Sequence, residues 1–339
     1  MQQLMFVGAG QLEWEEAPEP QLSTGADALV RPIAVATCDL DTALISGRAP
    51  LPGRFAFGHE FVADVLEVGT AVTSVRAGDR VIVPFQVSCG TCEWCVRGLT
   101  ASCATAGAGA AFGMAPIARR EWGGALSDSV RVPYADAMLV ALPAGIEAAS
   151  VASVSDNVPD GWRAVAPELE RRPGAPVLVL GGAGDVALYA VGVAVALGSE
   201  QVDYVDTDVR RLAVAERLGA RAIERALEGG RVGRYPITVD HTGAVPGLQS
   251  ALRSTEPEGT CTSTAIYFAA ETALPLLDMY TRGVVFRTGR VNARAAIPRV
   301  LELISGGRLR PELVTSATVQ WDDAPSALAM LEAKTVVVR

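Results

Sequence analysis

The chain has 339 residues, of which half are apolar, and a formal net charge of −9 at pH 7. This length suits two domains of ordinary size. The acidic balance argues against a nucleic-acid partner, because phosphate backbones require a basic face. The uncharged and strongly apolar stretch at residues 186–199 is shorter than the roughly 20 residues that a membrane span requires. The first residues show no basic stretch followed by an apolar one, so we expect no secretory leader, a cytoplasmic location and no membrane partner.

The first 150 residues predict a β-rich domain. Short runs rich in β-branched residues alternate there with turns that contain glycine and proline, and they lie at 28–33, 61–68, 80–84 and 129–132. Two segments of this region carry candidate metal ligands, ATCDLD at 36–41 and GHE at 58–60. The chain has only two histidines, and His59 is one of them. A lone histidine is more often a core residue, so its neighbours decide the interpretation.

Four cysteines lie close together within residues 87–104, with the spacing C-x2-C-x2-C-x7-C: Cys89, Cys92, Cys95 and Cys103. Four thiolates can surround one tetrahedral cation, and zinc is the usual occupant of such a site. An all-sulfur site has no open position, so it holds a loop together and does no chemistry. The alternatives are accidental clustering and disulfides, which an intracellular-looking chain disfavours.

From about residue 176 the pattern changes to that of a doubly wound α/β domain. Unbroken apolar runs predict buried parallel strands at 177–180, 202–205 and 237–239, with a helix at 209–218 between two of them. Just before this region, Asp156 opens the segment DNVPDGW. Its carboxylate is a candidate metal ligand, and a helix cap is the alternative.

The strand at 177–180 runs directly into the sequence GGAGDVA at 181–187. Gly182 and Gly184 permit a tight turn close to a pyrophosphate, and Ala187 takes the third small position, where the helix packs on the strand. The free N–H groups of the helix that opens at Asp185 and Val186 would hold that pyrophosphate. The motif therefore predicts a dinucleotide-binding turn.

Asp206 ends the next strand, 22 residues after Gly184. A carboxylate at this place accepts hydrogen bonds from the adenosine ribose and repels the additional phosphate of NADP. We therefore predict NAD as the cofactor. Arg211, His241 and Arg290 are further candidate cofactor contacts. The alternatives are solvated arginines and a loop histidine bonded to the backbone.

These motifs occur in the order found in zinc-dependent medium-chain alcohol dehydrogenases, and the chain resembles that family from about residue 38 to the C-terminal strand. The resemblance implies an α/β protein with two domains. A β-rich GroES-like catalytic domain would comprise residues 1–155 and 291–339, with a zinc lobe at 87–104. A Rossmann cofactor domain, with a doubly wound parallel sheet, would comprise residues 156–290.

The resemblance also implies a structural zinc at the four cysteines and a catalytic zinc. The catalytic zinc would be bound by Cys38, His59 and Asp156, with Glu60 beside the metal. Zinc and substrate would lie in a cleft between the domains. Members of the family that keep the cysteine lobe are usually oligomers, so we expect a homodimer or homotetramer.

The segment around the candidate cysteine departs from the family pattern, in which a cysteine, a small residue and Ser or Thr precede Asp-Leu/Ile-His. Alignment on the Asp-Leu pair puts Ala36 at the cysteine's place. The 21-residue spacing to the histidine instead keeps Cys38 and puts Leu40 at the hydroxyl's place. We favour Cys38 as the ligand. The usual proton-carrying hydroxyl is then missing. Asp41 stands where many members of the family have a relay histidine, and Thr37 or Asp39 could supply a shorter route, so we expect a rebuilt or absent relay that Thr37 and Asp41 variants would test.

The expected activity is hydride transfer between NAD and an alcohol, or the matching aldehyde or ketone. Apolar residues in the predicted pocket loops at 46–57, 108–120 and 267–277 favour a hydrophobic substrate. One alternative is a biosynthetic reductase of C=N or C=C bonds that uses NAD(P)H and contains only the structural zinc. A non-enzymatic alternative is a nucleotide-binding sensor with a degraded site.

Overall fold

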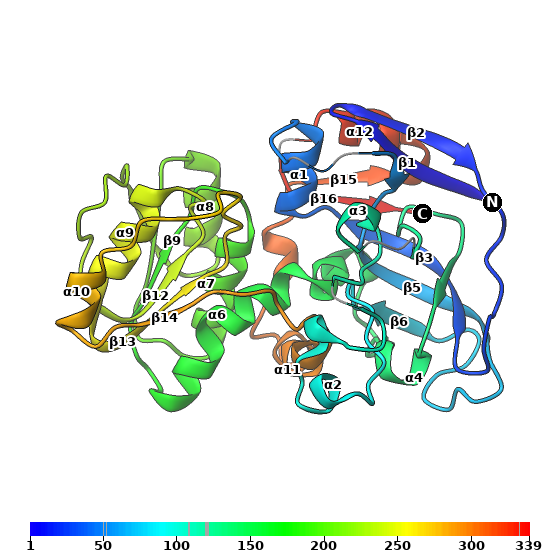
Figure 1. The fold of residues 1–339 in the computed structure, drawn as a ribbon, viewed down its shortest axis with the longest axis horizontal. Helices are drawn as coiled ribbons and strands as arrows, with labels where there is room; N and C mark the ends of the chain where they lie inside the picture. Colours follow the sequence, from blue (N-terminus) through cyan, green and yellow to red (C-terminus); the bar gives the residue numbers. More distant parts are fainter. Residues whose placement is uncertain (50, 52, 108, 119–121, 332) are drawn as a thin grey trace. The chain divides into compact units, whose positions relative to one another are not determined.

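The computed structural model describes residues 1–49, 51, 53–107, 109–118, 122–331 and 333–339 (Figure 1). The chain forms two compact units, one of residues 1–159, 292–305 and 315–339 and the other of residues 160–291 and 306–314. The return of 306–314 to the second unit was not expected from the sequence. The domain limits expected after residues 155 and 290 stay predictions. Five positions in the predicted pocket loops (50, 52, 108, 119 and 120) lie outside the described residues.

A largely antiparallel sheet forms the centre of the first unit (Figure 1). Its strand order is β15-β16-β3-β5-β6-β8, with β7 also paired to β3. The strands are β3 (Ala28–Ala36), β5 (Glu60–Val68), β6 (Arg80–Val83), β7 (Val130–Val132), β8 (Val140–Ala141), β15 (Ala317–Gln320) and β16 (Thr335–Val338). A second sheet has the order β2-β1-β4 and comprises β1 (Gln2–Gly8), β2 (Gln11–Glu16) and β4 (Phe55–Ala56).

The core of the first unit is apolar and aromatic. Phe6 packs against Phe55, and the ring of Phe61 meets Phe112 edge-on. The helices of this unit are α1 (Asp39–Ile45), α2 (Glu93–Val96), α3 (Ala115–Ala118), α4 (Ala135–Met138), α5 (Ala148–Val151), α11 (Ala293–Ser305), α12 (Ala324–Ala329) and the 3-10 turns η1 (Thr100–Ser102), η2 (Ala152–Ser155) and η4 (Trp321–Asp323).

The second unit contains a six-stranded parallel sheet in the order β11-β10-β9-β12-β13-β14. The strands are β9 (Val177–Leu180), β10 (Val202–Asp206), β11 (Arg221–Glu224), β12 (Tyr235–Asp240), β13 (Thr255–Ser263) and β14 (Val285–Arg287). Every residue of β9 and β12 is buried, as expected of central parallel strands. The predicted doubly wound sheet is therefore confirmed.

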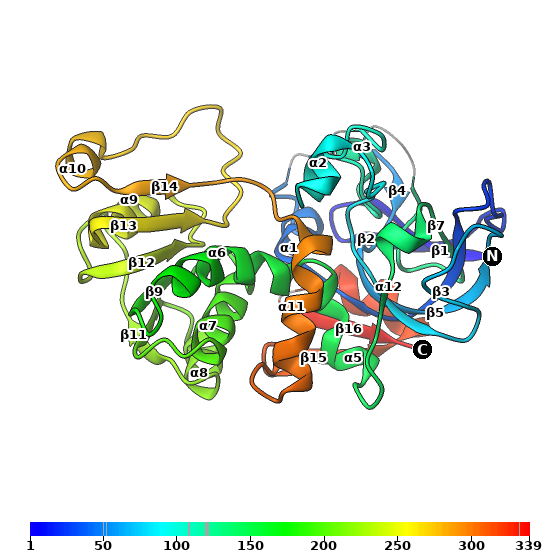
Figure 2. The same cartoon turned by 90° about the horizontal axis from the view of Figure 1, so that it is seen from below.

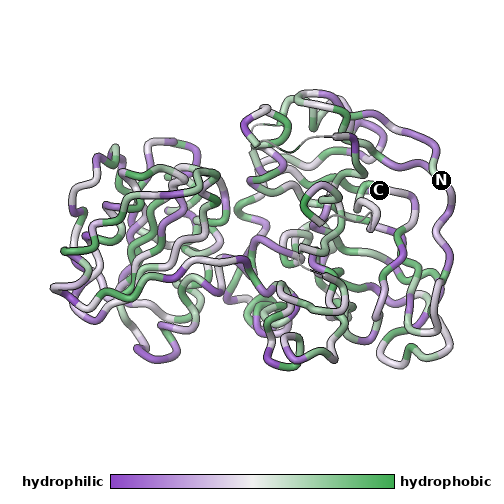
Figure 3. Tube along the Cα trace, viewed as in Figure 1, coloured by the Kyte–Doolittle hydropathy of each residue, from purple (hydrophilic) through white to green (hydrophobic). Residues whose placement is uncertain are grey.

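Helices cover this parallel sheet (Figure 2). Helix α6 packs closely on α7, because a Cβ atom at Gly161 would lie 2.6 Å from the backbone nitrogen of Ala190. The helices are α6 (Asn157–Arg171), α7 (Val186–Ala196), α8 (Val209–Arg217), α9 (Val245–Ser254), α10 (Leu276–Tyr280) and the 3-10 turn η3 (Pro311–Leu313). Apolar stretches gather along the inner strands of both units (Figure 3). Among the described residues, no helix has the length and apolar character needed to cross a bilayer.

Candidate metal centre

The four clustered cysteines come together as one potential metal site, with ligand atoms all within 4.8 Å of one another. All six cysteines of the chain are free of disulfides, which removes that alternative for the lobe. Backbone N–H groups point at the sulfurs: the Cys92 amide lies 3.3 Å from Cys89 Sγ, and the Cys89 amide lies 3.3 Å from Cys103 Sγ. Such donors favour thiolates over thiols, and thiolates are the form that binds zinc.

Neighbouring elements hold the cysteine lobe in place. Gly90 adopts a φ of +76°, and a Cβ atom there would lie 2.6 Å from the Cβ of Ala137 in α4. The amide of Ser88 donates to Met138 Sδ at the end of the same helix. On another side, the Asn292 side chain accepts a hydrogen bond from the Ala101 amide. The lobe is thus attached to the body of the first unit.

A second cluster contains Cys38, His59, Glu60 and Asp156, again with ligand atoms within 4.8 Å of one another. Strand pairing explains how it forms. Ala36 at the end of β3 pairs with Glu60 at the start of β5, so the residues that follow β3 lie beside those that precede β5. The hydroxyl of Ser155 donates to the Val83 and His59 carbonyls, which anchors η2 and places Asp156 at the same point.

The structure therefore brings together every residue that was expected to surround the second metal. Cys38, and not Ala36, reaches the cluster, since Ala36 is still part of the sheet. The spacing-based alignment is consequently the one that the fold supports. In that alignment Leu40 stands where the family has its hydroxyl. Cys38 also caps α1, and its sulfur accepts a hydrogen bond of 3.2 Å from the Leu40 amide.

The polar atoms of this cluster fit a bound cation. All four residues are buried, and among the described residues His59 Nδ1, His59 Nε2 and Glu60 Oε1 have no hydrogen-bond partner. Buried polar atoms without partners are costly unless something else satisfies them. A thiolate, an imidazole and carboxylates form a donor set that zinc accepts. The residues present therefore fit the metal that the family resemblance implies.

Asp41 is not exposed to solvent, as a side chain that carries protons out of the site would be. Its carboxylate is buried, accepts a 2.9 Å hydrogen bond from the Cys38 amide, and lies 3.6 Å from His59 Nδ1. The other imidazole nitrogen, Nε2, lies 3.6 Å from Asp156 Oδ2. Asp41 thus faces the side of the imidazole that points away from Asp156.

Thr37 is engaged with the C-terminal strand. Its hydroxyl accepts a 3.0 Å hydrogen bond from the Thr335 amide and lies 3.4 Å from the Thr335 carbonyl oxygen. This contact aligns β16 with the end of β3. A relay role for Thr37 or Asp41 stays a prediction, and both side chains have structural partners in this fold.

Two residues of the cluster were not predicted from the sequence. Lys334, which is 1% exposed, donates to Glu60 Oε2 at 2.9 Å and to Asn157 Oδ1 at 2.8 Å. The Asn157 amide nitrogen in turn lies 3.3 Å from Asp156 Oδ2. One signal was available: Lys334 is the only lysine in the chain.

Burial dominates the electrostatics of this cluster. It raises the pKa of the Cys38 thiol to about 12, with the Asp41 charge acting in the same direction. Burial also raises the pKa of Glu60 well above its ordinary value, although Lys334 opposes that shift. For His59 burial acts downward, but the charges of Cys38 and Asp41 outweigh it and raise its pKa. A cation placed among these groups would favour their metal-binding forms.

In the second unit, the predicted dinucleotide turn has the expected local form. Gly182 has a φ of +133°, and α7 begins at Val186 directly after Asp185. A Cβ atom on Gly182 would approach Thr242, which follows β12. Strands β9 and β12 are neighbours although they are not consecutive, so this turn lies where the strand order reverses. Ligands of open α/β sheets bind at such a point.

Asp206 lies at the end of β10 as expected, but its carboxylate is already occupied. Oδ2 accepts from the Tyr204 hydroxyl at 2.6 Å, and both oxygens accept from Arg211, at 2.8 and 3.1 Å. Amides of Thr207 and Asp208 complete the set. Burial works against ionisation, yet the bonds from Arg211 and Tyr204 hold the pKa of Asp206 below its ordinary value.

The remaining candidates for cofactor contact lie in the second unit as well. His241 is buried after β12, and its Nδ1 lies 2.9 Å from the Thr264 hydroxyl. Its backbone bonds to Leu180 and Ala183, which ties it to the dinucleotide turn. Arg290 is exposed.

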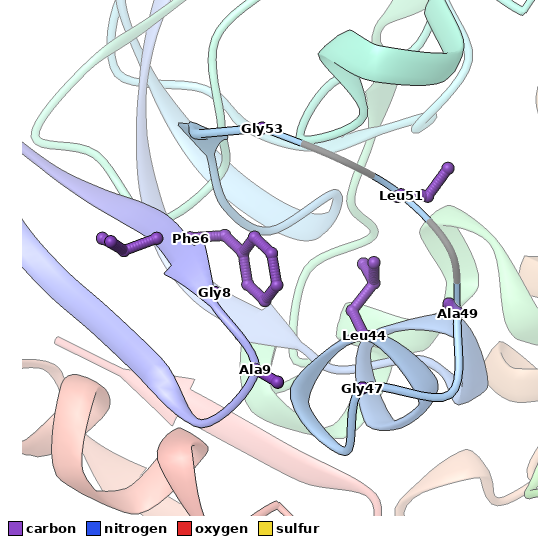
Figure 4. Close-up of a pocket in the computed structure, with 9 residues that line it drawn as sticks. Phe6, Gly8, Ala9, Leu44, Gly47, Ala49, Leu51 and Gly53 are labelled. Carbon is purple, nitrogen blue, oxygen red and sulfur yellow. The ribbon is translucent and has the colours of Figure 1, made fainter.

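A pocket of about 210 Å³ lies in the first unit (Figure 4). The side chains of Phe6 and Leu44 are directed into it. Part of its wall comes from one of the predicted pocket loops, and the lining consists of Phe6, Val7, Gly8, Ala9, Leu44, Gly47, Ala49, Leu51 and Gly53.

Comparison with known proteins agrees with this geometry. Residues 24–144 match the alcohol dehydrogenase GroES-like domain. A medium-chain reductase/dehydrogenase of an Acremonium species is 30% identical over 80% of this chain and 95% of its own. A probable zinc-binding alcohol dehydrogenase of Mycobacterium tuberculosis is 27% identical over 98% of this chain and 86% of its own. The alcohol dehydrogenase TADH from Thermus sp. ATN1 superposes with a TM-score of 0.90 at 29% identity, covering 100% of this chain and 99% of its own.

The chain belongs to the zinc-dependent alcohol dehydrogenase family of medium-chain dehydrogenases/reductases. Its four-cysteine lobe is the structural zinc cluster of that family, and its second cluster corresponds to a catalytic-like site.

Proposed function

We propose that this protein transfers a hydride between NAD and a small or medium apolar alcohol, or the matching aldehyde or ketone. One observation carries the proposal: Cys38, His59 and Asp156 converge in a buried cluster in which both imidazole nitrogens lack hydrogen-bond partners among the described residues. A sensor with a degraded site would have no reason to keep such costly groups together.

In this proposal Cys38 Sγ, His59 Nε2 and an oxygen of Asp156 hold the catalytic zinc. When bound, zinc supplies Lewis-acid polarisation of a hydroxyl or carbonyl oxygen. Asp41 lies 3.6 Å from Nδ1 and Asp156 lies 3.6 Å from Nε2, so Nε2 is the nitrogen that faces the other proposed ligand. The apolar residues of the predicted pocket loops support a hydrophobic substrate.

The test is zinc per chain by elemental analysis, together with absorbance of NADH at 340 nm in the presence of a panel of alcohols. Two zinc ions per chain and NADH formation with an apolar alcohol support the proposal. One zinc ion per chain and no NADH formation contradict it.

A second candidate function, reduction of an iminium-like C=N bond, is favoured by Leu40. A carbonyl carbon that accepts hydride leaves an oxygen that must be protonated, whereas an iminium carbon leaves a neutral amine. The fold supports the alignment that puts Leu40 at the place of the relay hydroxyl, and Thr37 is bonded to β16. Faster NAD(P)H oxidation with a cyclic iminium salt than with the matching ketone would favour this reading.

We propose NAD over NADP because Asp206 ends β10 beside the dinucleotide turn. Arg211 neutralises much of that carboxylate's charge, so the discrimination should be moderate. We expect kcat/KM for NAD to exceed that for NADP by about tenfold, which is about 1.4 kcal/mol. Asp206→Ser should abolish the preference, and an NADP preference in the unaltered protein would contradict the assignment.

We propose a homo-oligomer that forms through the edge of the parallel sheet. Strand β14 ends that sheet, and Val285 on it is 44% exposed. The neighbouring helix α10 exposes Leu276, Leu277 and Tyr280 by 65%, 75% and 84%. Such an apolar edge is a place for pairing with a second copy. Sedimentation should give a dimer or tetramer, and Leu277→Glu with Tyr280→Glu should yield monomers; a monomeric unaltered protein contradicts the proposal.

A cytoplasmic location remains a prediction.

A further inference from the structure

The turn that leads from β9 into α7 contains one acidic residue. Asp185 is the N-cap of α7, which begins at Val186. The dinucleotide pattern of this turn calls for small residues at Gly182, Gly184 and Ala187, and it does not explain an aspartate at this place. In the proposed function, the N–H groups that open α7 hold the pyrophosphate of NAD. The carboxylate of Asp185 therefore belongs to the same turn as the proposed pyrophosphate site.

A second carboxylate and a tyrosine lie against this turn. A Cβ atom at Gly181 would meet the Tyr204 hydroxyl and Asp206 Oδ2, so the glycine leaves room for both groups. Tyr204 is buried, and its hydroxyl donates to Asp206 Oδ2 at 2.6 Å. Burial and the charge of Asp206 raise the pKa of Tyr204 well above its ordinary value, and the charge of Asp185 acts in the same direction. The carboxylates of Asp185 and Asp206 therefore both act on one hydroxyl beside the turn.

The cations of the neighbouring segment are shared among carboxylates. Arg211 donates to both oxygens of Asp206, at 2.8 and 3.1 Å, and lies 3.4 Å from Asp208 Oδ2. Arg210 lies 3.3 Å from the same oxygen of Asp208. In the turn and in the segment that joins β10 to α8, two arginines thus accompany three carboxylates, the third being that of Asp185. A pyrophosphate adds negative charge to a part of the second unit where acids already outnumber cations.

Resting on the proposed function, we propose that the charge of Asp185 weakens cofactor binding, because its carboxylate repels the pyrophosphate at the start of α7. A helix N-terminus attracts anions through the partial positive charge of its N–H groups, and a carboxylate at the same end offsets part of that charge. Asp185 thus selects, among ligands of the adenosine site, against those that place phosphate at the start of α7. The repulsion favours exchange of NAD for NADH at each turnover over retention of the cofactor.

The test is calorimetric binding of ADP-ribose, which carries the pyrophosphate, and of adenosine, which does not, to the whole chain. Asp185→Asn removes the charge and keeps a side chain that suits an N-cap. In this variant the dissociation constant of ADP-ribose should fall by about tenfold, while that of adenosine stays within about twofold. Asp185→Gly should act in the same direction, and it serves if the asparagine variant does not fold. Glu216→Gln removes an exposed charge near the far end of α8 and should change neither constant.

Ionic strength gives a second readout of the same charge. Added KCl should weaken ADP-ribose binding more steeply in Asp185→Asn than in the unaltered protein, because the variant has lost a repulsion that salt screens. Equal salt dependence in the two proteins would overturn the inference.

A dissociation constant of ADP-ribose that is unchanged or higher in both Asp185 variants would also overturn the inference, as would an equal gain for adenosine. Each of these results leaves the proposed function intact, since the unaltered protein still binds the dinucleotide. Failure of NADH and ADP-ribose to bind to the unaltered protein and to both variants would instead overturn the proposed function, and this inference with it.

Discussion

The two clusters of metal-binding side chains are built in opposite ways. The lobe takes four identical ligands from one short segment, and its N–H···S bonds arise within the same loop. The second cluster takes four side chains of three chemical kinds from positions between residues 38 and 156, and strand pairing assembles it. We expect the lobe to depend on its metal for its shape, whereas strand pairing shapes the second cluster and the proposed metal there would supply chemistry.

The largest expected effect is the difference between substituting a buried cysteine inside the second cluster and substituting a buried cysteine outside it. Burial raises the pKa of both Cys38 and Cys261 to about 12, but only Cys38 lies in a cluster. Cys38→Ala should lower the metal content from two to one per chain. Because several kcal/mol of charge stabilisation is lost, kcat/KM should fall by about 10³-fold. The matched control, Cys261→Ala, should keep both metals and its activity, as measured by elemental analysis and steady-state kinetics.

Loss of the lobe metal should act on stability more than on chemistry. Cys103→Ser should lower the free energy of unfolding by several kcal/mol, less than the roughly 10–16 kcal/mol of zinc-finger peptides, because α4 also supports the lobe. Denaturant titration measures the loss. Turnover measured below the melting temperature should stay within about threefold of the unaltered protein. A variant that keeps its stability but loses its turnover would reverse the roles of the two clusters.

A smaller effect is expected from the carboxylate behind His59. Asp41→Asn should weaken metal binding at the second cluster by about 10–100-fold, the usual cost of losing an outer partner of a histidine ligand. Metal affinity of the lobe should not change, and competition with a chelator separates the two affinities. Asp39→Asn is a control in the same helix. An equal effect of both variants would point to the loss of negative charge in the first turn of α1 as the cause.

The smallest effect concerns Asp136 in α4, the helix that supports the lobe. Hydrogen bonds from the Ser74 amide and hydroxyl, and from Thr73, lower the pKa of Asp136 to about 2. A depressed pKa contributes stability above the unfolded-state value of about 3.9 and loses it as pH falls toward 2. Melting temperatures of the unaltered protein and Asp136→Asn should therefore differ at pH 7 and converge near pH 2. A constant difference would mean that the hydrogen bonds do not depend on ionisation.

Patterns in short stretches of sequence predicted the features whose residues lie close together in the chain. The cysteine lobe, the dinucleotide turn and the buried parallel strands followed from spacing and apolar runs, and the family resemblance ordered them. The ligand choice at Cys38 was left between two alignments, and strand register supports one of them, since Ala36 pairs with Glu60.

Lys334 and Asn157 were missed because nothing near them in sequence indicates the cluster. Lys334 reaches it because β16 pairs antiparallel with β3, which places Val336 opposite Ala36. Such a long-range register depends on the whole sheet and cannot be read from a short window. Asp41 was expected in a proton route for a related reason: the alignment alone did not show that its carboxylate faces His59.

The rarity of lysine also gives this protein a built-in proteolytic reporter. A lysine-specific protease has one target in the printed sequence, the bond between Lys334 and Thr335. That bond lies where β16 enters the sheet, and the lysine side chain is buried. Cleavage therefore requires the C-terminal strand to detach first. A single cut, followed over time, would measure how often the C-terminal strand of the first unit detaches while the rest stays folded.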